Sequence, residues 1–331
     1  MASVKYVFEK GSKSVKMFTV QAKACKKTEN SPMKPLLVAS PVEEGDYPVV
    51  VFLHGYLLYN SFYSQLFNHV ASHGFIVIGP QNSSLRLVER VNNFRQEETE
   101  TSALYVVSGA DTTEEIKSAA SLLDWLTHNL ASTLPPQVRP DLTKLSIAGH
   151  SRGGKVAFAL ALGKVVSSPI KISTLIGIDP VDGMDMGNQT PPPILTYEPN
   201  SLKLDMPVLV VGSGLGELKR NALFPPAAPK GVSHEQFFNE CCAPACYFVA
   251  KDYGHVDMLD DETKGFRGNL TYCIAKNGKE RKPMRLFVGG IMVAFLKAYL
   301  EQEKGTLMAI KDNPGVAPVE VSTCSFLERI N

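Results

Sequence analysis

Cysteine is scarce in this chain, with six residues among 331. They are too few and too scattered for the disulfide framework of small secreted proteins. Three of them lie in the run from Cys241 to Cys246, but no second Cys/His pair follows at the spacing of a zinc site. We therefore expect a local disulfide or simple packing at this run, and no metal site.

Long apolar runs and an excess of one charge are also missing. No run approaches the roughly 20 apolar residues that span a bilayer, so a soluble or peripheral protein is expected. Lys and Arg total 34 against 33 Asp and Glu, a formal charge of +1, and no dense basic run occurs. These values argue against a nucleic-acid partner and favour a small or uncharged one. The N-terminus lacks the apolar stretch of a secretory signal and the Arg-rich character of a transit peptide.

The composition is that of a folded globular protein. Hydrophobic residues make up 44% and charged residues 20%, so the chain can bury a sizeable core. We expect a single α/β domain over residues 1–331, with a core of about 32–304 and a tail, 305–331, of uncertain order.

Short buried strands alternate with amphipathic helices along the chain, which predicts a mostly parallel sheet flanked by helices. The expected strands cover residues 49–53, 74–79, 145–149, 174–178, 207–211 and 247–250, and the expected helices 61–72, 112–130, 155–162 and 285–300. Thr112 to Glu115 has the pattern of a capping box. The segment between Gly212 and Tyr247 is rich in Pro, Ala and Gly and is long enough for a lid or binding loop.

Residues Gly149 to Gly153 read Gly-His-Ser-Arg-Gly, between a buried strand and a helix of small residues. G-x-S-x-G at such a junction is the nucleophile elbow of the α/β-hydrolase fold, and only in that context is the short pattern specific. The sequence therefore predicts an α/β-hydrolase in which Ser151 is the nucleophile.

A serine hydroxyl needs an imidazole base, which in this fold comes later in the chain. Only His234 and His255 follow Ser151. His255 comes shortly after an expected strand, the usual place of the base, whereas His234 suits a helix start or a surface position. We predict His255 as the base.

The acid that orients this base should stand between serine and histidine in the chain. Asp179 lies at the end of the strand 174–178, and Asp182 is a rival three positions later. Asp179 is favoured and Asp182 is kept as the alternative; either could instead be a helix cap.

Two backbone N–H groups should stabilise the oxyanion of the intermediate. One comes from the residue after the nucleophile and one from the loop after the first buried strand, which are Arg152 and Tyr56. His54 and His150 precede Ser151 and are expected to be packing or hydrogen-bonding neighbours.

The sequence closely resembles the plant chlorophyllases, which are lipase-like serine hydrolases. The resemblance extends from about Pro32 to Leu300 and rests on four segments: 149–154, 51–56, 177–183 and 253–261. By matching position it implies a triad of Ser151, Asp179 and His255.

The resemblance also implies hydrolysis of the phytyl ester of chlorophyll through an acyl enzyme, with no cofactor. It implies a chloroplast location, while the cytosol and other endomembranes stay open. Leu223 to Pro226, with Phe237 and Phe238, could supply an apolar surface for the substrate or simply pack the insertion down. A general carboxylesterase, lipase or polyester hydrolase remains an alternative, as does a non-enzymatic binding protein of the same fold.

Overall fold

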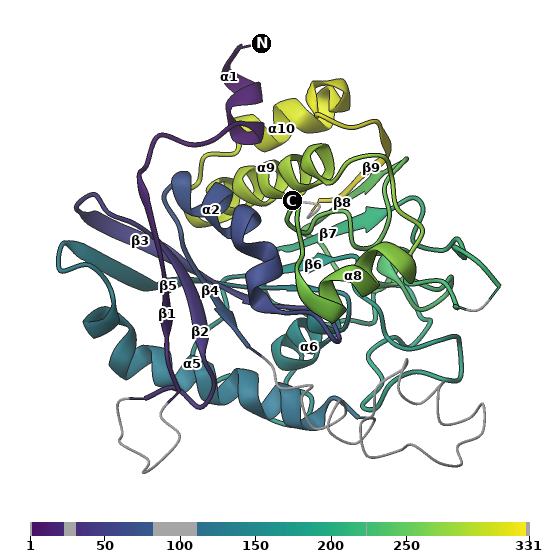
Figure 1. The fold of residues 1–331 in the computed structure, drawn as a ribbon, viewed down its shortest axis with the longest axis horizontal. Helices are drawn as coiled ribbons and strands as arrows, with labels where there is room; N and C mark the ends of the chain where they lie inside the picture. The colour runs from purple at the N-terminus through teal and green to yellow at the C-terminus, as the bar shows by residue number, and fades with distance from the viewer. Residues whose placement is uncertain (1, 23–30, 82–110, 223, 329–331) are drawn as a thin grey trace.

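The computed structural model describes residues 2–22, 31–81, 111–222 and 224–328, and its centre is a nine-stranded sheet (Figure 1). The strands are β1 (Val15–Val20), β2 (Leu36–Pro41), β3 (Gly45–Leu53), β4 (Ile76–Pro80), β5 (Val138–His150), β6 (Thr174–Ile178), β7 (Val208–Ser213), β8 (Ala245–Ala250) and β9 (Val321–Leu327). Their order across the sheet is β1-β2-β4-β3-β5-β6-β7-β8-β9. Each of the six strands predicted from the sequence is present.

The strands from β4 to β8 in this order run parallel, and the outer strands at both edges pair antiparallel. The central strands are rich in Val, Ile and Leu; β6 and β7 are buried along their length and β3 is buried from Tyr47 onward, as strands covered on both faces must be. Since their carboxyl ends meet at one edge, the loops after β3, β5, β6, β7 and β8 gather there. The mostly parallel α/β fold is as predicted.

Helices cover both faces of the sheet (Figure 1). The helices of the described residues are α1 (Ala2–Lys5), α2 (Ser64–Ser72), α5 (Thr113–Thr133), α6 (Arg152–Ala161), α7 (His234–Glu240), α8 (Gly265–Cys273), α9 (Arg281–Leu300) and α10 (Gly305–Asp312), with 3₁₀ turns η1 (Tyr6–Phe8), η2 (Asn60–Tyr63) and η3 (Pro314–Val316). Residues of α2, α9 and α10 form the core on one face, and residues of α5, α6 and α7 form it on the other. The sheet separates these two cores.

Helix α9 is long and apolar enough to cross a membrane by length and composition, which the sequence-based expectation overlooked. In the fold, however, 78% of its apolar stretch is buried inside the molecule. It packs against α2, and the Cβ of an alanine at Gly290 would lie 2.2 Å from Phe8. Its apolar character is that of a core helix.

The segments outside the expected core are ordered where the structure describes them. Strand β1 precedes residue 32 and forms one edge of the sheet. Residues 305–328, for which no regular structure was predicted, contain α10 and the other edge strand, β9. Strand β9 is only half-buried and carries no apolar run, so its pairing with β8 decides its conformation.

The predicted capping box at the start of α5 does not form. The hydroxyl of Thr112 donates to the carbonyl of Pro191 at 2.9 Å, and Glu115 pairs with Arg152. Instead, Asp111 accepts the N–H of Thr113 at 2.6 Å. Thr112 and Glu115 therefore bond to residues distant in the chain rather than to each other's backbone N–H groups.

The expected local disulfide in the Cys241 to Cys246 run is also not present. Within the described residues, all three cysteines of this run are free thiols, as are Cys273 and Cys324. Cys25 lies outside the described residues. Cys241 and Cys246 are buried, so packing is the interpretation that stands for them.

Candidate active site

Ser151 lies in a sharp turn between β5 and α6, with φ 55° and ψ −125°. A Cβ at Gly149 would lie 2.2 Å from the carbonyl oxygen of Gly153, and a Cβ at Gly153 would lie 2.1 Å from that of Leu53. Only glycine fits both positions. The N–H of Ser151 donates to Ile178 at 3.0 Å, which ties the turn to the next strand. Ser151 thus has the backbone of a nucleophile elbow.

Asp179 and His255 meet at the same edge of the sheet. Asp179 directly follows β6 with φ 44°, and its N–H donates to Val211 of β7 at 2.6 Å. His255 lies in the loop after β8, and its Nδ1 is 2.8 Å from Asp179 Oδ2. Ser151 and His255 line the same cavity. The structure therefore gathers all three residues of the predicted triad at one place.

The surroundings of Asp179 keep it ionised. Burial raises its pKa, but the hydrogen bond and charge of His255, with His234 and Ser213, outweigh burial and hold the pKa at about 2. An ionised carboxylate only accepts hydrogen bonds, so Nδ1 of His255 carries the proton. In the neutral imidazole the lone pair is then on Nε2, which is the tautomer that a general base requires.

Ser213 and His234 belong to this site, and the sequence-based reasoning missed both roles. The Ser213 hydroxyl donates to Asp179 Oδ2. His234 begins α7, as its helix-start interpretation predicted, but it is buried, and its Nε2 is 3.7 Å from Asp179 Oδ1. Its Nδ1 is 2.7 Å from the hydroxyl of Tyr247. The position of Ser213 at the carboxyl end of β7 was a usable signal, whereas nothing local marked His234.

Asp182, the alternative acid, has a different set of partners. Its Oδ1 is 2.8 Å from Nζ of Lys155, and its Oδ2 accepts the N–H groups of Ile194 and Leu195 at 2.8 and 2.9 Å. Burial lowers the pKa of Lys155, and the charge of Asp182 partly offsets this. Asp182 thus connects α6 to the segment around Ile194, and these contacts indicate that it stabilises the fold.

The two expected oxyanion donors, Arg152 and Tyr56, line the same cavity as Ser151. Arg152 is the first residue of α6, where backbone N–H groups point out of the helix end. Tyr56 follows β3, and its N–H makes no hydrogen bond to another described residue. The guanidinium of Arg152 lies 5.3 Å from the centre of the Tyr56 ring and pairs with Glu115 at 2.7 Å. These contacts connect α6 to the oxyanion loop, which is the segment after β3 that contains Gly55 and Tyr56.

His54 and His150 are hydrogen-bonding neighbours, as expected. His150 Nε2 is 2.7 Å from the carbonyl oxygen of His255, which can only accept, so Nε2 carries the proton. Burial, with the charge of His255, lowers the pKa of His150 to about 3, so its ring is neutral and Nδ1 accepts from the Tyr63 hydroxyl at 2.7 Å. The Tyr63 oxygen in turn accepts the N–H of Gly55 at 3.1 Å. This chain of bonds joins the oxyanion loop to the backbone of the candidate base.

A cavity of about 260 Å³ opens above Ser151 and His255. Its walls come from the loop after β3, the segment after β6, the insertion and the region of α8; the lining residues include Leu57, Leu58, Val181, Phe224, Pro225, Pro226, Arg267, Leu270 and Ile274. Most of these side chains are apolar, so the cavity suits a hydrophobic group next to the reacting ester.

The two interpretations of the insertion both hold, each for different residues. Phe224, Pro225 and Pro226 line the cavity. Phe237 and Phe238 are instead buried in the core: the ring centres of Phe237 and Phe158 are 4.8 Å apart, and those of Phe238 and Tyr247 are 4.7 Å apart. Leu223 lies outside the described residues.

Comparison with known proteins shows the family to which the chain belongs. A family model for chlorophyllase matches residues 3–103 and 101–328. Chlorophyllase-2 of Arabidopsis thaliana is 57% identical over 320 residues, 94% of each chain, and chlorophyllase-1 of the same plant is 44% identical over 90% of this chain and 86% of its own. A relative in Citrus unshiu named chlorophyllase-1, chloroplastic, is 35% identical over 97% of this chain and 89% of its own. The chain belongs to the chlorophyllase family.

Proposed function

We propose that this protein hydrolyses the phytyl ester of chlorophyll to chlorophyllide and phytol. The observation that carries the proposal is the site itself: Ser151, His255 and Asp179 meet beside an apolar cavity in a chain of the chlorophyllase family. The apolar walls suit an ester with a long hydrocarbon alcohol.

In the proposed mechanism the Ser151 oxygen attacks the ester carbonyl while Nε2 of His255 takes its proton. Asp179 holds the imidazole in the required tautomer and stabilises its charge. The oxyanion accepts hydrogen bonds from the N–H groups of Arg152 and Tyr56. His255 then protonates the departing alkoxide, and phytol leaves an acyl enzyme on Ser151.

The second half of the reaction repeats these steps with water. His255 takes a proton from water as the water oxygen attacks the acyl carbon. The new intermediate collapses, Ser151 recovers its proton from His255, and the acid is released. The magnesium of chlorophyll belongs to the substrate and takes no part in these steps.

A contact with a lipid surface fits this substrate, and we propose that α8 makes it. Phe266 is 81% exposed and directly precedes the cavity-lining Arg267. Exposed apolar side chains near the entrance of a site are typical of proteins that work at a membrane surface. Phe266→Ser should lower the fraction that sediments with phosphatidylcholine vesicles; unchanged sedimentation would contradict this contact.

A chloroplast location is proposed as well, on the strength of the Citrus relative named chloroplastic. A fluorescent fusion of the full chain in leaf cells, compared with chlorophyll fluorescence, tests it. A signal outside the plastids would overturn it.

The enzyme assay compares chlorophyll a with a short p-nitrophenyl ester. We expect efficient turnover of chlorophyll, and a loss on the order of 10⁴-fold or more in kcat for Ser151→Ala. Fast cleavage of the short ester without chlorophyll turnover would favour a general carboxylesterase. Full activity of Ser151→Ala would contradict the mechanism itself.

A further inference from the structure

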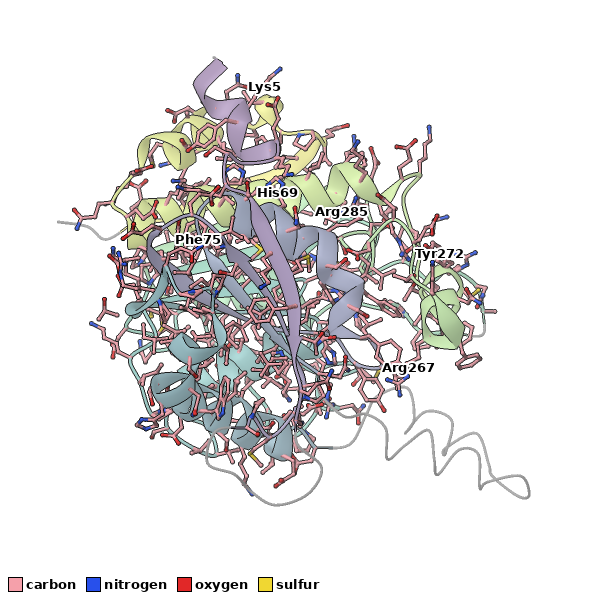
Figure 2. The ribbon with its side chains drawn as sticks, turned by 60° about the vertical axis from the view of Figure 1, so that its left-hand side comes forward. Lys5, His69, Phe75, Arg267, Tyr272 and Arg285 are labelled. Carbon is pink, nitrogen blue, oxygen red and sulfur yellow. The ribbon has the colours of Figure 1, made fainter. Side chains whose placement is uncertain are left out.

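Arg267 stands in the wall of the cavity that Ser151 and His255 share. It is the third residue of α8 and is only 8% exposed. Figure 2 labels it near one end of this helix, with Tyr272 near the other. Its guanidinium lies 4.9 Å from the centre of the Tyr59 ring, which fixes one face of the group.

The charge of Arg267 has no counterpart among the residues that the structure describes. Its Nη2 is buried and makes no hydrogen bond to any of them, and none of their carboxylates pairs with it. The other buried arginines differ: Arg285 pairs with Asp261 at 2.9 Å, and Arg281 donates to Thr271 at 2.7 Å. Burying a guanidinium without an acceptor is costly, so the position calls for an oxygen that arrives with a ligand.

We infer that Arg267 binds a carbonyl oxygen on the acid half of the ester substrate, away from the bond that is cleaved. This inference rests on the proposed function. The alcohol half, phytol, is hydrocarbon apart from the reacting oxygen and offers no other acceptor. The acid half of chlorophyll carries a ring ketone and a second ester, and either carbonyl can accept from a guanidinium.

The contact with Arg267 also orients the substrate in the cavity. Because Arg267 shares its part of the wall with Leu270, Thr271 and Ile274, the edge of the macrocycle lies against α8. The phytyl chain then extends from Ser151 in another direction. The enzyme therefore discriminates between esters by their acid half.

The test is Arg267→Met with two esters of the same alcohol, chlorophyll a and phytyl hexanoate, which has no further oxygen. For chlorophyll, kcat/KM should fall by roughly 10- to 100-fold, mostly through KM, as for the loss of a hydrogen bond to a charged group. For phytyl hexanoate it should change by no more than about threefold. Lys264→Met removes an exposed cation beside the same helix and should leave both rates within about twofold.

The outcomes are distinguishable. Equal losses for both esters would show that Arg267 only supports the wall, and no loss for either would show that it contacts no substrate oxygen; both results overturn the inference. A wild-type enzyme that cleaves phytyl hexanoate but not chlorophyll overturns the proposed function, and the inference with it. If Arg267→Met fails to reach the wild-type melting temperature, Arg267→Lys serves instead, since a lysine cannot reproduce the planar donor geometry and should show the same selective loss at smaller size.

Discussion

At the scale of single residues, Asp179 and Asp182 are three positions apart and have different partners. Asp179 accepts hydrogen bonds from His255 and Ser213, whereas Asp182 forms an ion pair with Lys155 and accepts hydrogen bonds from two backbone N–H groups. Asp179→Asn should lower kcat by about 10⁴-fold with little change in the melting temperature, because the imidazole loses its tautomer. Steady-state kinetics and thermal unfolding of the purified variant measure both quantities.

Asp182→Asn is the matched variant and should show the opposite pattern. It leaves the buried Lys155 without its ion pair, which costs about 3–5 kcal/mol of folding free energy. The activity of the folded fraction should stay near that of the wild type. A large loss of kcat for Asp182→Asn beside a small one for Asp179→Asn would exchange the two assignments.

Tyr63 and His150 hold the oxyanion loop and the candidate base together. Tyr63→Phe removes the hydroxyl that accepts from Gly55 and donates to His150, which should cost about 1–3 kcal/mol of stability. Because both sides of the site lose a support, kcat should also fall, by roughly tenfold.

Tyr47→Phe is the control for this variant. The hydroxyl of Tyr47 donates to the carbonyl of Glu43, outside the candidate site, at 3.0 Å. Its removal should lower stability without changing kcat per folded molecule. If Tyr63→Phe behaves in the same way, the hydrogen bonds of Tyr63 stabilise the fold but do not position His255 for catalysis.

At the scale of elements, the edge strand β9 covers β8, the strand that leads to His255. The two pair over Ala245 to Ala250, and the rings of Phe248 and Phe326 are 5.6 Å apart. A chain that ends at Ala317 loses this strand and leaves the edge of β8 open to other chains.

This truncation should lower the urea midpoint and promote aggregation, which light scattering and urea unfolding measure. A chain that ends at Glu328 keeps β9 and should match the full-length protein. A shorter chain that stays monomeric with the full-length midpoint would show that β9 contributes little.

At the scale of the whole molecule, three buried histidines make stability depend on pH. Burial, as the main cause, lowers the pKa of His54 and of His69 to about 4 and that of His150 to about 3, from an ordinary 6.5. Between these values the unfolded chain binds protons that the folded protein does not, so stability falls as the pH drops below 6.5. The slope should reach about 1.4 kcal/mol per pH unit for each histidine.

His69 is the residue on which to test this, because it lies outside the candidate site. Figure 2 labels it together with Arg285; the charges of His73 and Arg285 add to the effect of burial on its pKa. Its Nε2 donates to the carbonyl of Val7 at 2.8 Å, a bond that a glutamine amide can also make. His69→Gln should lose less stability than the wild type between pH 7.5 and pH 5 in urea titrations. Equal losses would contradict a neutral buried His69.

The sequence alone determined the features that depend on neighbours in the chain. A strand that is buried on both faces, such as Val49 to Leu53, is a continuous apolar run. Such a run can be recognised in the sequence without knowing which strands are its neighbours in the sheet. The elbow around Ser151 needs glycines at fixed offsets, because atoms a few residues away would collide with any side chain. The chain order of nucleophile, acid and base then limited the candidates to a few residues.

Only the tertiary structure decided the features that depend on distant parts of the chain. Asp179 and His255 are 76 positions apart, and the choice between Asp179 and Asp182 depends on which one the fold brings to the imidazole. The burial of His234, the pairing of β9 and the missing hydrogen-bond acceptor for Nη2 of Arg267 among the described residues follow from the same cause. Hydrogen bonds and charges act over a few ångströms in space, and the packing of the sheet determines which residues come that close.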